Sequence, residues 1–162
     1  MAGRGLRRWG LTMNAIIACG AGFLVAVLWF DLMFDVQVQR RGPDRASDDV
    51  LASIAAYYRR VTIEARPMNL LVSSVMALTL AAIIVQIVQG AQPVWVGWGS
   101  LALAAGAIGL ALARTVRNAV RLAFARDLPE VQTRLAVEIY RDHLICLAAM
   151  LLVIGLQLVT SL

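Results

Sequence analysis

The chain has 162 residues, 60% of them hydrophobic, with a mean hydropathy of +0.75. This composition is too apolar for a soluble domain of this size and predicts a membrane protein. The net charge of +5 is spread over several segments without a basic block, which gives no case for nucleic-acid binding. The two cysteines, Cys19 and Cys146, form no CxxC pair, which argues against a dithiol oxidoreductase.

Four apolar runs are long enough to cross about 30 Å of hydrocarbon. Only QGAQP joins the second and third, which predicts an antiparallel hairpin. The predicted fold is all-α: residues 1–162 form a single integral membrane domain, a four-helix bundle. The four spans are expected at residues 11–30, 68–88, 94–113 and 144–162. Small residues in these runs predict close helix contacts in lipid, and they are Gly20, Gly22, Ser73, Ala77, Gly106 and Gly109.

The first run begins after RGLRRWG, which resembles the start of a signal peptide. The apolar run continues 11 residues past Cys19, so we expect an uncleaved spanning helix. The run ends in FDLMFD, where Asp31 and Asp35 share one helical face. Carboxylates at this spacing repel each other, and near lipid each needs a partner. We expect an arginine of another helix, Arg114 or Arg117, to contact one of them.

Two segments between the spans carry helical signals of their own. In the first, residues 47–66, Ser47 is a candidate N-cap, and Pro67 marks a kink or a restart of the helix. In the second, residues 128–143, DLPE is a capping box with Asp127 as the cap. No Gly or Pro follows until Gly155, which predicts one helix running from about Leu128 into the last span. We expect the second spanning helix to extend beyond the membrane in the same way.

Arginine supplies all 15 basic residues, and its distribution predicts the orientation. Six arginines lie in residues 31–67 and six in residues 114–143, against three before the first span. Because basic loops stay on the cytoplasmic side, both long segments are expected in the cytoplasm, Asp44 and Arg126 among them, with both termini outside. The predicted location is the cytoplasmic (inner) membrane of a bacterium.

A weak internal repeat links YYRR at 57–60 with IYRD at 139–142, since each precedes a spanning run. It would fit two parallel helical hairpins related by an axis along the membrane normal, with chance similarity as the alternative. This register brings polar residues from all four helices to one level. The candidate ligand-binding residues of this polar mouth are Asp31, Asp35, Arg59, Glu64, Arg114, Arg117, Asn118, Glu138, Arg141, Asp142 and His143.

Two interpretations of this polar mouth remain open. It is either a structural ion-pair lattice at the membrane rim or a polar cavity that binds a substrate or an ion. His143 is the single histidine and no Glu-x-x-His pair occurs, so we expect no metal site and assign no cofactor. No nucleotide-binding or serine-nucleophile motif is present.

The segment VRNAVRLAFARDLPEVQTRLAVEIYRDHL, residues 116–144, resembles the anthrone-oxygenase-like family of small bacterial membrane proteins. In that resemblance Asn118, Arg141 and His143 correspond to the family's Asn near the end of helix 3 and its basic approach to helix 4. The resemblance implies an oxygenase or a protein that binds a hydrophobic ligand. The tryptophan-rich approach to helix 4 that is typical of the family is missing.

The leading functional hypothesis is therefore a non-catalytic accessory subunit of the membrane. Its expected partners are the lipid bilayer and either a membrane protein or a second copy of the chain. The alternative is a small membrane enzyme, or a binding protein for a lipid-soluble ligand at the polar mouth. A transporter or channel ranks third, because no spanning run carries a charge near its midpoint.

Overall fold

The computed structural model describes residues 2–39, 46–90 and 92–159, with side chains from residue 10 onward. All secondary structure in these ranges is helical, which confirms the predicted all-α fold. The elements are α1 (Ala2–Asp35), η1 (Val36–Val38), α2 (Asp48–Arg59), η2 (Arg60–Glu64), α3 (Arg66–Val88), α4 (Val94–Leu110), η3 (Ala111–Thr115), α5 (Val116–Ala123) and α6 (Pro129–Val159).

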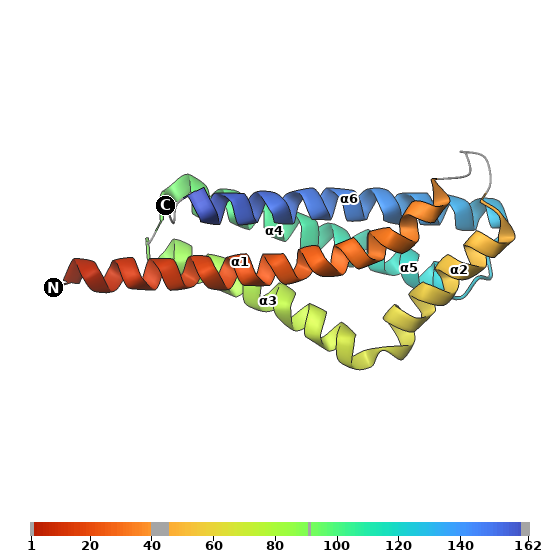
Figure 1. The fold of residues 1–162 in the computed structure, drawn as a ribbon, viewed down its shortest axis with the longest axis horizontal. Helices are drawn as coiled ribbons and strands as arrows, with labels where there is room; N and C mark the ends of the chain where they lie inside the picture. Colours follow the sequence, from red (N-terminus) through yellow and green to blue (C-terminus); the bar gives the residue numbers. More distant parts are fainter. Residues whose placement is uncertain (1, 40–45, 91, 160–162) are drawn as a thin grey trace.

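Four helical segments are long and apolar enough to cross a membrane, which confirms a multi-pass membrane bundle. Figure 1 shows α1, α4 and α6 running side by side, with α3 leaning away from them toward its own N-terminal end. The start of α1 and the end of α6 lie at one end of the bundle, and α2 and α5 lie at the other (Figure 1). The four segments are Gly10–Val38, Arg66–Val88, Val94–Ala123 and Pro129–Val159.

The core within the membrane depends on close approaches at two glycines. A Cβ at Gly20 would lie 2.3 Å from Oγ1 of Thr79, so α1 and α3 meet where α1 has no side chain. A Cβ at Gly97 would lie 2.7 Å from Cγ1 of Ile87, in the hairpin of α3 and α4. Three glycines predicted to make close contacts do not make them, because a Cβ there would meet no described atom within 4 Å. These are Gly22, Gly106 and Gly109.

A second apolar core lies at the end of the bundle that holds α2 and α5. The stripe of α2 that includes Ile54 and Tyr58 is buried against Leu122 of α5 and Ile139 of α6. The helix α2 begins directly after Ser47, at the predicted position, with Asp48 and Asp49 in its first turn. This packing fixes α2 beside the ends of the spanning helices.

The chain turns sharply between α2 and α3. Ala65 leaves the helical region with φ −86° and ψ 57°, and Pro67 stands in the first turn of α3, where its missing N–H costs nothing. Pro67 therefore marks a restart, and the second span does not continue into α2 as a straight extension, contrary to our expectation. The third span extends instead, because α4 continues through the π-helical turn η3 into α5.

The prediction of one helix entering the last span is confirmed. Helix α6 runs without a break for 31 residues, about 47 Å. Asp127, the cap of the predicted capping box, accepts two hydrogen bonds of 2.8 Å from Arg121 through its carboxylate. A bidentate guanidinium is a stronger donor for a carboxylate than a backbone amide. Asp44 lies outside the described residues.

Candidate functional site

A buried charged cluster joins α1, α2 and α6 beside the second core. Asp35 is fully buried, and its Oδ2 lies 2.6 Å from Nδ1 of His143. Its other oxygen accepts a 2.5 Å hydrogen bond from the hydroxyl of Tyr58. A carboxylate out of water needs such partners, and here the last turn of α1 finds both.

Asp31 lies one turn earlier on the same face of α1. Its Oδ1 accepts a 2.6 Å hydrogen bond from the hydroxyl of Tyr57, whose ring stacks on Phe34 at 4.0 Å. Its Oδ2 lies 3.9 Å from Nε2 of His143, the second nitrogen of the ring that binds Asp35. One imidazole therefore faces both carboxylates.

The environment of the two tyrosines of α2 raises the pKa of each hydroxyl above its ordinary value. Burial is the largest cause that raises the pKa of Tyr57, and the carboxylate of Asp31 raises it further. Burial followed by the carboxylates of Asp35 and Asp31 raises the pKa of Tyr58 well above its usual value. Both hydroxyls therefore stay protonated as donors at physiological pH.

The expected contact between Asp31 or Asp35 and an arginine was wrong for the described residues. Arg114 instead binds Asp142 of α6 through both carboxylate oxygens, with Nε 2.9 Å from Oδ2. Asp142 is fully buried and also accepts a 3.0 Å hydrogen bond from the hydroxyl of Thr115. The π-helical turn that contains Arg114 and Thr115 points both toward α6.

The remaining candidate residues are placed around this cluster or away from it. Asn118 donates a 3.0 Å hydrogen bond to Glu138, which joins α5 to α6. Arg59 and Glu64 form an exposed pair of 3.3 Å on the outer side of the turn between α2 and α3. The side chains of Arg117 and Arg141 are exposed. Five candidates therefore come together in the cluster, namely Asp31, Asp35, Arg114, Asp142 and His143.

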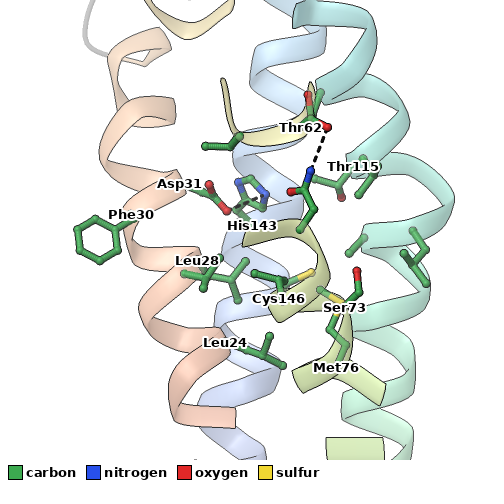
Figure 2. Close-up of a pocket in the computed structure, with 18 of the residues that line it drawn as sticks. Leu24, Leu28, Phe30, Asp31, Thr62, Ser73, Met76, Thr115, His143 and Cys146 are labelled. Atoms are coloured by element: carbon green, nitrogen blue, oxygen red, sulfur yellow. Dashed lines mark hydrogen bonds and ion pairs between the residues drawn. The ribbon is translucent and has the colours of Figure 1, made fainter. Parts of the chain in front are cut away.

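A cavity of about 590 Å³ opens beside the cluster, within the membrane-spanning part of the bundle. Figure 2 shows Asp31 and His143 at its polar end, and Leu24 and Met76 further into the apolar part. Asn69 of α3 closes the polar end by donating a 3.1 Å hydrogen bond to the carbonyl of Thr62, drawn dashed in Figure 2. The rest of its wall is mostly apolar and comes from the four spanning segments together with α2 and η2.

The cavity occupies the place where α3 leaves the bundle. In the described part of the chain α3 packs against α1 and α4, while its backbone does not approach α6. Its described residues 66–78 include no buried side chain, and the first buried residue is Thr79. This half of the spanning helix is thus at most partly buried, with Val72, Val75 and Met76 packed against the core within the membrane.

At the far end of the bundle a polar network ties α3 to its neighbours. The amide of Gln86 donates 2.8 Å hydrogen bonds to Asn14 of α1 and Gln157 of α6, and Gln157 donates to Ser100 of α4 at 2.9 Å. All four side chains are buried. The network fixes α3 at one end, so that its other end alone borders the cavity.

Neither the tyrosines nor Thr115 were among the predicted site residues. The pattern YYRR, taken as a repeat, contained the signal, because two adjacent hydroxyls can reach two carboxylates one turn apart on another helix. Among the described residues, no group of three or more His, Cys, Asp or Glu side chains has the arrangement of a metal site.

The comparisons with known proteins correct two expectations. The family described as SHR3 chaperone, ER membrane protein SH3, has a model that matches residues 10–160. No curated protein and no solved structure matches the chain. The family match overturns the resemblance to the anthrone-oxygenase-like family, which depended on about 30 residues. It also overturns the predicted location in a bacterial inner membrane, because the matching family is described as an ER membrane protein. The chain belongs to the SHR3 chaperone family.

Proposed function

We propose that this protein is a non-catalytic chaperone of the endoplasmic reticulum membrane that holds a transmembrane segment of a membrane-protein partner. The observation that carries the proposal is that residues 66–78 of α3 include no fully buried side chain and border a cavity of about 590 Å³. Helices associate in lipid through van der Waals packing and polar contacts, and this half of α3 has surface left for a further helix. Here a partner's helix completes the packing.

The wall of the cavity suits varied partners. Met68 and Met76 of α3 and Met150 of α6 line it. Methionine is unbranched and flexible, so a surface rich in it adapts to side chains of different shape. A chaperone must bind several related segments, and this lining supports that role.

The family description supports the same proposal. It names a chaperone and an ER membrane protein, and the match extends over nearly all the described residues. We extend both terms to this chain, the first as its activity and the second as its location. Fluorescence microscopy of the tagged chain in a eukaryotic cell, against an ER membrane marker, tests the location.

Two neighbouring serines of α3 provide a matched test of the activity. Both side chains are exposed, but Ser73 lines the cavity and Ser74 lies outside its wall. We expect Ser73→Trp to fill the cavity and to abolish co-purification of membrane-protein partners from native membranes. Ser74→Trp adds the same ring to the same helix and should leave co-purification unchanged.

The outcome that contradicts the proposal is equally direct. If both tryptophan variants retain their partners in the same amount, the cavity does not hold them. Partners retained by a surface at the α2 end would then be released by substitutions on α2 instead. Quantitative mass spectrometry of the purified membrane complexes measures either result.

A further inference from the structure

The charges around the cavity do not balance. Asp31 and Asp35 face one shared imidazole, that of His143, which carries at most one positive charge. Arg114, which was expected to contact these aspartates, is bound to both oxygens of Asp142. The tyrosine hydroxyls donate hydrogen bonds but carry no charge. With both aspartates ionised, one negative charge at the end of the cavity lacks a cation among the residues that the structure describes.

Asp31 is the carboxylate that a bound molecule can reach. Its side chain is 17% exposed and lines the cavity, whereas Asp35 is fully buried behind it. Among the described residues its Oδ2 has only the 3.9 Å approach of His143, longer than a hydrogen bond. This oxygen therefore has room for a stronger donor from within the cavity.

An apolar groove in a membrane cannot by itself select a protein partner. Lipid tails are as apolar as leucine side chains, so they fill such a groove about as well as a helix does. Selection of a transmembrane segment therefore has to come from packing and from polar contacts. The polar end of this cavity supplies such contacts next to the apolar part.

We infer that the partner segment carries a basic side chain, lysine or arginine, and that this side chain reaches Asp31 through the cavity. The inference rests on the proposed function and names the partner's chemistry. A cavity of about 590 Å³ is too small for a whole helix but has room for a long side chain. The helix itself packs outside, along residues 66–78 of α3.

The arrangement would stabilise a basic residue in a membrane protein that has not yet assembled. A basic residue in a spanning segment is costly in lipid until it finds an acidic or polar partner in its own fold. While the segment waits for assembly, Asp31 supplies the opposite charge and Asn69 and Thr62 surround it with polar atoms. Release follows when the partner's own fold provides better contacts.

Synthetic single-span peptides test the inference on the full-length protein in nanodiscs of neutral phosphatidylcholine. Each peptide has about 20 leucine and alanine residues. One peptide carries two lysines, each about one helical turn from one of its two ends. Its matched control carries acetyl-lysine at the same two positions. Energy transfer from a label on the protein measures binding. We expect the lysine peptide to bind roughly tenfold more tightly, as expected for a hydrogen bond between charged groups.

Variants of the protein locate the contact. Asp31→Asn should remove the preference for lysine, and Asp31→Glu should retain it. Asp127→Asn, far from the cavity in the pair with Arg121, should have no effect. Ser73→Trp should block both peptides. If Asp31→Asn does not fold, the comparison of the two peptides on the natural chain still decides the question.

Several results would overturn the inference. Equal binding of both peptides means that the groove holds segments without recognising charge, so the proposed function survives and the inference fails. Absence of binding by either peptide removes the proposed function as well. A lysine preference that persists in Ser73→Trp places the contact outside the cavity. A copurified phospholipid or second copy of the chain that the lysine peptide does not displace identifies another occupant.

Discussion

Nδ1 of His143 lies 2.6 Å from Oδ2 of Asp35, although 108 positions separate the two residues in the sequence. The contact joins the end of α1 to the middle of α6, and the same ring faces Asp31. A single side chain thus links the two aspartates to the helix that carries the last span.

Loss of this imidazole should destabilise the bundle. We expect His143→Leu to lower the free energy of unfolding by about 3–5 kcal/mol, because it leaves buried carboxylates without their charged partner. Thermal unfolding in detergent measures the change. Arg141→Leu, at an exposed position two residues earlier on α6, is the control and should have little effect. Equal stability of the two variants would mean that the cluster does not contribute to folding.

The close approach of α1 and α3 predicts a sharp difference between two glycines. Gly20→Ala places a methyl group against Oγ1 of Thr79, which would have to leave its 2.7 Å hydrogen bond to the carbonyl of Val75. Overpacking of this kind costs about 1–3 kcal/mol. Gly22→Ala meets no described atom within 4 Å and should be tolerated.

A compensating variant checks the cause. Thr79→Ala removes the oxygen that the new methyl group meets. Adding Gly20→Ala to the Thr79→Ala variant should therefore cost less stability than adding Gly20→Ala to the natural chain. Additive losses in the same unfolding experiment would show that the two residues do not meet.

The polar network at the far end should contribute a measurable share of stability. Gln86→Leu removes hydrogen bonds to Asn14 and Gln157, each 2.8 Å long. Since interhelical hydrogen bonds in membranes are worth about 0.6 kcal/mol on average, we expect a loss of about 1–2 kcal/mol. Gln89→Leu, at an exposed position at the end of the same helix, provides the comparison. A loss of the same size in both variants would argue against the network.

The tyrosines of α2 predict a loss of stability at alkaline pH. The pKa of Tyr57 and that of Tyr58 are raised in the folded chain, so the unfolded chain releases these protons first, from about pH 10. The stabilisation they provide is present below pH 10 and is lost as the pH rises toward the folded pKa.

Chemical unfolding followed between pH 9 and pH 12 checks this dependence. The double variant Tyr57→Phe/Tyr58→Phe should be less stable than the natural chain at pH 8, because two hydrogen bonds are gone. Its stability should also fall less steeply above pH 10. Parallel curves for the two proteins would show that neither hydroxyl is coupled to folding.

Local patterns in the sequence predicted most of the fold. The apolar runs predicted the four spans, Ser47 predicted where α2 begins, and the absence of breakers predicted the unbroken α6. Pro67 predicted a kink or a restart, and the backbone breaks two residues earlier, at Ala65, with φ and ψ of −86° and 57°. The straight extension of the second span was wrong, because alanine at position 65 ordinarily favours helices and gives no sign of the break.

The candidate site was predicted in part, and the reason lies in that same break. Asp31, Asp35, Asp142 and His143 were identified as polar residues at one level, and the structure brings them together. The tyrosines that bind two of these carboxylates were not identified. The break at Ala65 lets α2 fold against α1 instead of extending the second span, and this brings the tyrosines to Asp31 and Asp35. Charge counting favoured arginine as the partner, whereas buried hydroxyls satisfied the carboxylates instead.

The π-helical turn Ala111–Thr115 holds one residue more than an α-helical path of the same length. A homologue that has lost one residue here would follow an ordinary α-helical path through the third span, and the helix on either side would keep its alignment. Asn118 would still face Glu138, and Ala119 would stay in the core beneath α2. In an alignment of family members, a single-residue gap inside this span would mark proteins whose topology is unchanged and whose cavity wall differs at this turn, which contributes Ala111, Leu112 and Thr115.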